Sequence, residues 1–196
     1  MAALTDLERR LRALESTRGK LETLHTRQMI ARRDLERVYD GLYISAVTSF
    51  EDFFEARFYQ VMLQPAARRP EVVPRTEFKS SAVLREFVLG GRNFVNWLPF
   101  ERTEQRAKVY LRGGMPFTVV DAGDKRRMKN WMIVRNAIAH TSREAKRRFE
   151  REILAGVPLP PRERTPAGYL RSQPRPSASR FQTIVLEMLG IAAKLH

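Results

Sequence analysis

Two polar residues interrupt an apolar stretch in the second half of the chain, and a histidine follows them. Residues 125–140 read KRRMKNWMIVRNAIAH, and between Trp131 and Ala139 only Arg135 and Asn136 are not apolar. An unpaired buried amide costs roughly 1–3 kcal/mol, and a buried guanidinium costs more. Such a pair inside a core helix therefore needs partners or a hydrated site, and His140 stands close enough in sequence to belong to it.

These three residue types suit metal-independent cleavage of RNA. A neutral imidazole, whose ordinary pKa is about 6.5, can take a proton from a ribose 2′-hydroxyl or give one to a leaving oxygen. A guanidinium is always cationic and suits a phosphate that gains charge in a transition state. Asn136 can orient the imidazole or hold the phosphate. Together they predict cleavage through a 2′,3′-cyclic phosphate, which DNA, lacking the 2′-hydroxyl, could not undergo.

Helical spacing relates the three side chains. At about 100° per residue, Asn136 and His140 lie one turn apart, about 40° from each other, so their side chains can meet. Arg135 lies about 100–140° from both and reaches them only by its length, by a helix break or across a subunit boundary. Structural roles remain open for each: a helix-end charge for His140, a register-fixing core amide for Asn136, and a core ion pair for Arg135.

Basic residues flank the motif and predict phosphate contacts. Lys125 and Lys129 fall on the same side of the helix as Asn136 and His140. If the helix continues unbroken, Arg143 and Arg147 extend this stripe. The sequence TSRE at 141–144 is instead typical of a capping box, which predicts a break just after His140. The histidine would then lie at a helix end, next to free amides suited to phosphate.

The pattern Arg135, Asn136, three residues and His140 resembles the RNxxxH signature of the HEPN superfamily, and is similar to its RiboL-PSP-HEPN-like group. The resemblance implies an all-helical endoribonuclease that acts as a homodimer, with motif helices meeting across the subunit boundary to build a composite site. It also implies a toxin–antitoxin or antiviral setting, with an antitoxin protein as a possible partner. The stretch SFEDFF at 49–54 resembles the helix that offers an acid toward the motif in this family, with Glu51 as first choice and Asp52 as second.

Composition limits the other classes of function. The 196 residues favour one domain, and the net charge of +14 predicts a polyanionic partner, most simply RNA. Anionic lipid and a merely arginine-rich composition are the rival explanations. With no cysteine and three widely spaced histidines, we expect no metal and no cofactor. We find no signal-like start and no apolar run of about 18 residues, so we expect a soluble, cytoplasmic protein without a membrane partner.

Periodicity predicts an all-α fold: a bundle of about four core helices in a single domain over 1–196. An N-terminal helical extension is expected over 1–40, with a phase slip near Gly19 that favours a hairpin or a short dimer contact over a long coiled coil. A core helix follows Gly41, Ser80 or Ser81 caps a shorter helix, and Asp124 caps the motif helix. We interpret the Pro/Arg-rich stretch 157–179 as a loop or arm before the last helix.

Two rivals to the ribonuclease remain. The first is a HEPN-like module that binds RNA or a nucleotide without cutting it. The second is a structural interaction protein that assembles through residues 4–38, with incidental charge. Weak dependence on salt would count against both nucleic-acid interpretations.

Overall fold

The computed structural model describes residues 2–63, 72–174 and 178–196, and in these ranges the chain forms eight α-helices and no β-strand. The predicted all-α class is confirmed. The α-helices are α1 (Ala2–Thr26), α2 (Arg32–Met62), α3 (Ser81–Leu89), α4 (Phe100–Tyr110), α5 (Ala122–Ala139), α6 (Arg143–Glu152), α7 (Pro166–Arg171) and α8 (Arg180–Lys194). Short 3₁₀ helices lie at Arg112–Gly114, Phe117–Val119 and Pro161–Glu163.

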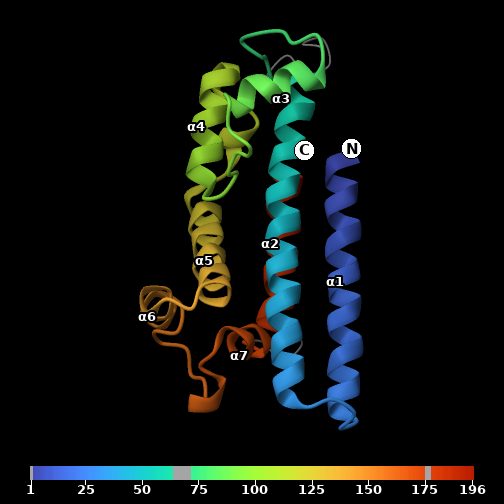
Figure 1. Ribbon diagram of the computed structural model, residues 1–196, viewed down its shortest axis with the longest axis vertical. Helices are drawn as coiled ribbons and strands as arrows, with labels where there is room; N and C mark the ends of the chain where they lie inside the picture. The colour runs from blue at the N-terminus through green and yellow to red at the C-terminus, as the bar shows by residue number, and fades with distance from the viewer. Residues whose placement is uncertain (1, 64–71, 175–177) are drawn as a thin grey trace.

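The two longest helices, α1 and α2, form an antiparallel hairpin along one side of the molecule (Figure 1). Of the two expected arrangements, a hairpin and a short dimer contact, the chain forms a hairpin, but its turn lies at 27–31, where Gln28 adopts a left-handed φ of 59°. Gly19 and Gly41 lie inside helices instead. A helical glycine costs only about 1 kcal/mol, less than the packing of the apolar stripe contributes. Residues 32–40 thus belong to the core helix α2, so the expected extension over 1–40 is wrong at its boundary.

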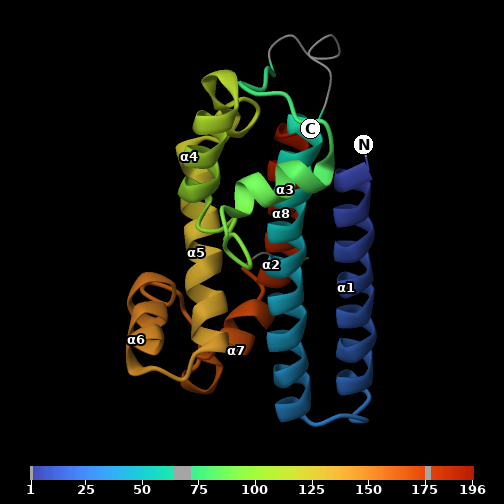
Figure 2. The ribbon, with the colours of Figure 1, turned by 45° about the horizontal axis from the view of Figure 1, so that its top comes forward.

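Helix α2 is the centre of the core, and the buried side chains of α4, α5 and α8 surround it. Its aromatic residues provide much of this contact: Phe50 lies edge-on to Trp131 of α5 at 5.6 Å between ring centroids. The Tyr43 hydroxyl donates to the Trp131 carbonyl at 3.0 Å, which fixes α5 against α2. Helix α8 lies behind α2 (Figure 2), and the buried Arg57 guanidinium donates to the Leu195 carbonyl at 2.7 Å.

The ends of α5 are set by local caps. Asp121, not Asp124, is the N-cap, and its side chain accepts from the Asp124 amide at 2.8 Å. Asp124 is buried and forms an ion pair with Lys194 at 2.6 Å, so the expectation that it caps the helix is wrong. At the other end the backbone turns extended at His140 (φ −122°, ψ 130°). The predicted break after the motif is confirmed.

Helix α6 begins immediately after this break and folds back beside α5 (Figure 1). Its cap is Ser142, whose hydroxyl accepts from the Ala145 amide at 3.2 Å. The capping residue therefore lies one position later than Thr141, the first residue of the predicted box. The alternative of one unbroken helix from α5 through α6 is excluded.

The prediction of a loop or arm for the Pro/Arg-rich stretch 157–179 is confirmed for most of its described residues, which lie outside any α-helix, but it is wrong for residues 166–171. Part of it forms α7, which packs on α2, α5 and α8 with Ala167 and Leu170 buried. A side chain at Gly168 would place its Cβ 2.3 Å from the Glu163 carbonyl oxygen, so only glycine permits this close turn. The apolar island around Leu170 is enough to anchor a six-residue helix despite the flanking prolines. Residues 175–177 of the stretch lie outside the described residues.

Helix α3 has the ends that the sequence predicts. The Ser80 side chain accepts from the Val83 amide, and Gly90 ends the helix with a left-handed φ of 54°. A loop over 91–99 then crosses to α4, and α3 and α4 together form the end of the molecule farthest from α6 (Figure 1).

Candidate functional site

The motif residues lie at the C-terminal end of α5. Arg135 and Asn136 are half-buried in its last turn, and the Arg135 Nη1 donates to the Asn136 Oδ1 at 3.3 Å. His140 is exposed as the C-cap residue, and its backbone amide donates to the Asn136 carbonyl at 3.0 Å. The structure thus joins the arginine and the asparagine and leaves the imidazole open to solvent.

The imidazole of His140 does not meet the other two side chains within one chain. In the described residues no hydrogen bond joins it to Arg135 or Asn136. The expected approach of Asn136 and His140 assumed that the helix continued to residue 140. Because the backbone becomes extended there, the shared helical face ends one residue too early.

The two acidic candidates of α2 have other partners. The Glu51 Oε1 accepts from the backbone amides of Trp97 and Leu98, at 2.9 and 3.2 Å. Asp52 lies on the side of α2 that faces α1, where it forms an ion pair with Arg10 at 2.9 Å. Within the described residues, no hydrogen bond or ion pair connects either carboxylate to Arg135. Glu51 anchors the loop before α4 in this chain.

We therefore expect Glu51→Ala to destabilise the fold by about 1–3 kcal/mol, because two backbone amides lose their charged acceptor. Urea unfolding measures this loss. The matched control is Asp52→Ala, which breaks an exposed ion pair and should cost about 1 kcal/mol or less. Equal stability of the Glu51 variant and the wild type would contradict the anchoring role.

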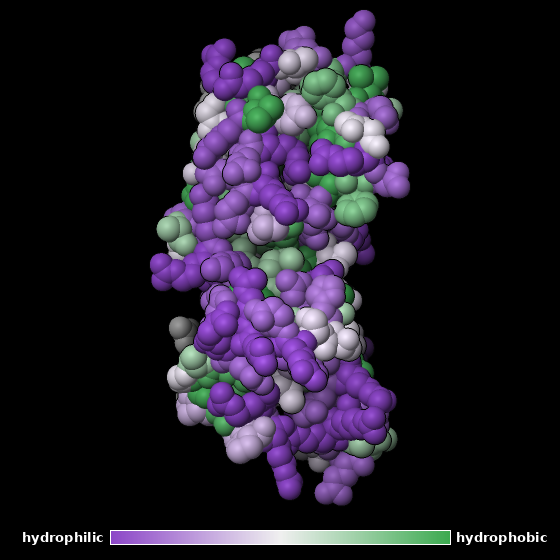
Figure 3. All heavy atoms as spheres, turned by 60° about the vertical axis from the view of Figure 1, so that its left-hand side comes forward, coloured by the Kyte–Doolittle hydropathy of each residue, from purple (hydrophilic) through white to green (hydrophobic). Residues whose placement is uncertain are grey.

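The four predicted phosphate-binding cations divide into two pairs. Lys125 is half-buried and bound to Glu104 at 2.6 Å, and the Lys129 ammonium lies 4.0 Å from Glu152. Arg143 and Arg147 are exposed on α6, and neither forms an ion pair in the described part of the chain. The face over α4, α5 and α6 is mostly hydrophilic (Figure 3). The two arginines are thus the cations most available to a phosphate.

A groove of about 300 Å³ opens beside Asn136, between α5, α6 and the start of α4. Lys129 and Arg148 line it together with Asn136. The Arg148 Nε donates to Glu152 at 3.0 Å, which holds the guanidinium on this side of α6. Arg148 was not among the predicted site residues. Its proximity depends on the backward fold of α6, and no pattern within either helix indicates it.

Asp40 is a second residue that the sequence interpretation missed. It is half-buried on α2, about 60° from Tyr43 and therefore on the side of α2 that faces α5 and α7. Its Oδ1 is buried without a hydrogen-bond partner in the described residues. Burial, followed by repulsion from Glu36, raises the pKa of Asp40 to about 6. The sequence could have identified Asp40, because helical spacing places this carboxylate on the same face of the helix as the apolar residues Tyr43 and Val47.

This raised pKa predicts a pH-dependent gain in stability for Asp40→Asn. Since the folded-state pKa lies above the ordinary 3.8, ionisation opposes folding, and the wild type loses stability as the pH rises from about 4 to about 6. After allowance for partial exposure, the variant should be about 1 kcal/mol more stable at pH 7.5, with little difference at pH 4. Urea unfolding at both values tests this. Exposed Asp34→Asn is the control and should show no such gain; a destabilised Asp40 variant at pH 7.5 would contradict the assignment.

Among the described residues, no group of three or more His, Cys, Asp or Glu side chains is arranged to hold a metal ion. No helix in the described parts of the chain combines the length and the apolar character that a membrane span requires.

Comparison with known proteins adds no relative to this description. No family model matches the chain, and no curated protein or solved structure was found to match it. The candidate site is therefore defined by its own residues: Arg135 and Asn136 joined in the last turn of α5, an exposed His140, and the free arginines that begin α6.

Proposed function

We propose that this chain is a metal-independent endoribonuclease of HEPN type, with Arg135, Asn136 and His140 in its site. The observation that carries the proposal is the break of α5 at the histidine. It presents an exposed imidazole directly after the last helical turn, which holds the bonded arginine–asparagine pair, and before exposed Arg143 and Arg147. Histidine is the side chain that can exchange protons near neutral pH, and these cations can hold a polyanion beside it.

The proposed reaction is an internal transfer at phosphorus. The ribose 2′-oxygen bonds to the adjacent phosphorus, and the bond from phosphorus to the 5′-oxygen breaks. The His140 imidazole accepts the 2′-hydroxyl proton, and the imidazolium formed in this way gives that proton to the departing 5′-oxygen. The products are a 2′,3′-cyclic phosphate and a 5′-hydroxyl. The Arg135 guanidinium binds the non-bridging oxygens as they gain charge, and Asn136 keeps the guanidinium in place.

The proposal includes a homodimer. The His140 imidazole makes no hydrogen bond to Arg135 within the described chain, so a single chain does not assemble the set. Met132, Ala137 and Ile138 are only partly buried, so the end of α5 retains apolar surface that a second copy could cover. A two-fold contact there would place each arginine beside the partner's histidine. An antitoxin partner and a defence role remain part of the proposal through the resemblance alone.

The test is incubation of the purified protein with a mixed RNA pool in EDTA at about pH 7.5, followed by analysis of the product ends. The expected products carry 2′,3′-cyclic phosphate or 3′-phosphate ends, and an RNA with 2′-O-methyl riboses should stay intact. Cleavage that requires a divalent metal, or that leaves 3′-hydroxyl ends, would contradict the mechanism.

The alternative is a HEPN-like module that binds RNA or a nucleotide without cutting it. It is favoured by the position of Arg135, which bonds to Asn136 and not to the imidazole. Salt-sensitive RNA binding, with no cleavage of any RNA in the pool and no loss of binding in His140→Ala, would support this alternative.

A further inference from the structure

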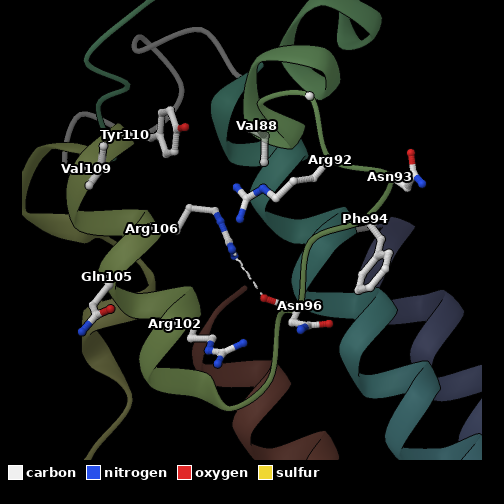
Figure 4. Close-up of a pocket in the computed structure, with 11 residues that line it drawn as sticks. Val88, Arg92, Asn93, Phe94, Asn96, Arg102, Gln105, Arg106, Val109 and Tyr110 are labelled. Atoms are coloured by element: carbon white, nitrogen blue, oxygen red, sulfur yellow. Dashed lines mark hydrogen bonds between the residues drawn. The ribbon is translucent and has the colours of Figure 1, made fainter.

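A cavity of about 780 Å³ opens between the end of α3, the loop after it and α4. Three arginines line it: Arg92 from the loop, and Arg102 and Arg106 from α4. The side chains of Arg92 and Arg106 extend toward one another across the cavity, and Arg102 lies below them (Figure 4). Three cations thus converge on one concave surface.

No carboxylate neutralises these three arginines in the described residues, where none of them forms an ion pair. Two of them bond to backbone carbonyls instead: the Arg92 Nε donates to the Leu89 oxygen at 3.0 Å, and both terminal nitrogens of Arg106 lie 3.5 Å from the Asn96 backbone oxygen. Arg18 and Arg171, elsewhere in the chain, each bind a glutamate. The cavity therefore holds concentrated positive charge that lacks an anion of its own.

The Arg106 guanidinium is also preorganised. It lies 4.5 Å from the centroid of the buried Trp97 ring, in a cation–π contact. Burial, and then repulsion from Arg92 and more weakly from Arg102, holds the pKa of Arg106 below its ordinary value. The Trp97 backbone is itself fixed by Glu51 at its amide and by the Thr103 hydroxyl at its carbonyl. An incoming anion would relieve this repulsion without reorganising the loop.

Apolar side chains complete the lining. Phe94 is 71% exposed and Val109 is 65% exposed, values unusual for such large apolar residues. An exposed aromatic ring beside paired guanidinium groups is the combination that receives a base together with its phosphate. The volume is in the range of cavities that bind small ligands.

We propose that this cavity binds a phosphorylated nucleotide unit, with its phosphates among Arg92, Arg102 and Arg106 and its base against Phe94. The unit is either a free nucleotide or one residue of a single strand. The cavity is distinct from the groove beside Asn136, because no residue lines both of them, although Glu101 of that groove directly precedes Arg102 in α4. The inference does not depend on the proposed cleavage.

Calorimetric titration of the full chain with ADP, with inorganic phosphate and with a 2′-O-methyl hexanucleotide tests the proposal. ADP or the hexanucleotide should bind more tightly than phosphate alone. The double variant Arg92→Gln/Arg102→Gln should weaken this binding by about tenfold or more, since each exposed guanidinium loses charge-assisted bonds. Phe94→Ala should weaken ADP but not phosphate.

The matched control is Arg12→Gln, which removes one exposed positive charge from α1 and should leave affinity unchanged. Thermal unfolding of each variant verifies the fold. ADP binding indicates a free-nucleotide site, and binding of the hexanucleotide alone indicates a strand site. The proposal would be overturned if neither ADP nor the hexanucleotide binds more tightly than phosphate, or if the control variant weakens binding as much as the double variant does. These experiments measure binding and not cleavage. A failure of the nucleotide-binding proposal therefore leaves the ribonuclease proposal unaffected, and a failure of the ribonuclease proposal leaves nucleotide binding unaffected.

Discussion

His140→Ala is expected to lower the initial rate of RNA cleavage by about a thousandfold, with the melting temperature unchanged. The rate should fall because no other side chain at the end of α5 can exchange protons near neutral pH, and acid–base catalysis contributes about 10²–10⁴-fold. Stability should persist because His140 is exposed and its contribution to the fold is a backbone bond, which alanine retains. The measurement is the initial rate on a labelled RNA, in EDTA, beside a melting curve.

The matched control for this variant is His25→Ala. His25 lies near the turn between α1 and α2, where its Nδ1 is 3.2 Å from the Ile30 carbonyl oxygen, and it has no part in the proposed site. The control should cleave at close to the wild-type rate. If both variants cleave RNA as fast as the wild type, His140 is not the acid or base.

Mixing two inactive variants, His140→Ala and Arg135→Gln, is expected to restore about a quarter of the wild-type activity. In a two-fold dimer each site takes the arginine of one chain and the histidine of the other. A mixed dimer then has one intact site of two, and random exchange makes about half of the dimers mixed. The two variants are unfolded and refolded together, or co-expressed with different tags, and the unseparated mixture is assayed. The mixed dimer purified from it should have about half of the wild-type activity, since one of its two sites is intact.

The control for mixing is a chain that carries both substitutions, combined with His140→Ala. This pair contains no histidine at position 140 and should stay inactive. Recovered mixed dimers without activity would show that each site takes both residues from one chain. If light scattering shows that the protein is a monomer, a site shared between two chains is excluded.

Local features of the sequence determined the helices and several of their ends. Ser80 and Gly90 bound α3 as expected, because a cap depends on neighbours within four residues. The break after His140 was predicted for the same reason, although the capping hydroxyl belongs to Ser142. Apolar periodicity likewise indicated an all-α chain. These are short-range interactions, and the residues that make them are adjacent in the printed sequence.

Local rules failed where packing outweighed propensity. Gly41 was expected to precede the core helix and lies inside α2, and the prolines around Leu170 predicted a loop where α7 packs on the core. In each case apolar burial against a distant element contributes more than the local cost of about 1 kcal/mol. The unfavourable helix propensity of these residues can be seen in the sequence, but the stabilisation by apolar burial depends on how the helices pack.

By itself, the sequence determined the helical class, the basic charge and the motif Arg135, Asn136, His140 with its exposed end. Only the tertiary structure decided what each polar group contacts. It joined Glu51 to the amides of Trp97 and Leu98, buried one oxygen of Asp40, and gathered three arginines around one cavity. The physical reason is range: capping and periodicity act within a few residues, whereas hydrogen bonds and charge clusters form between helices whose relative placement no local pattern specifies.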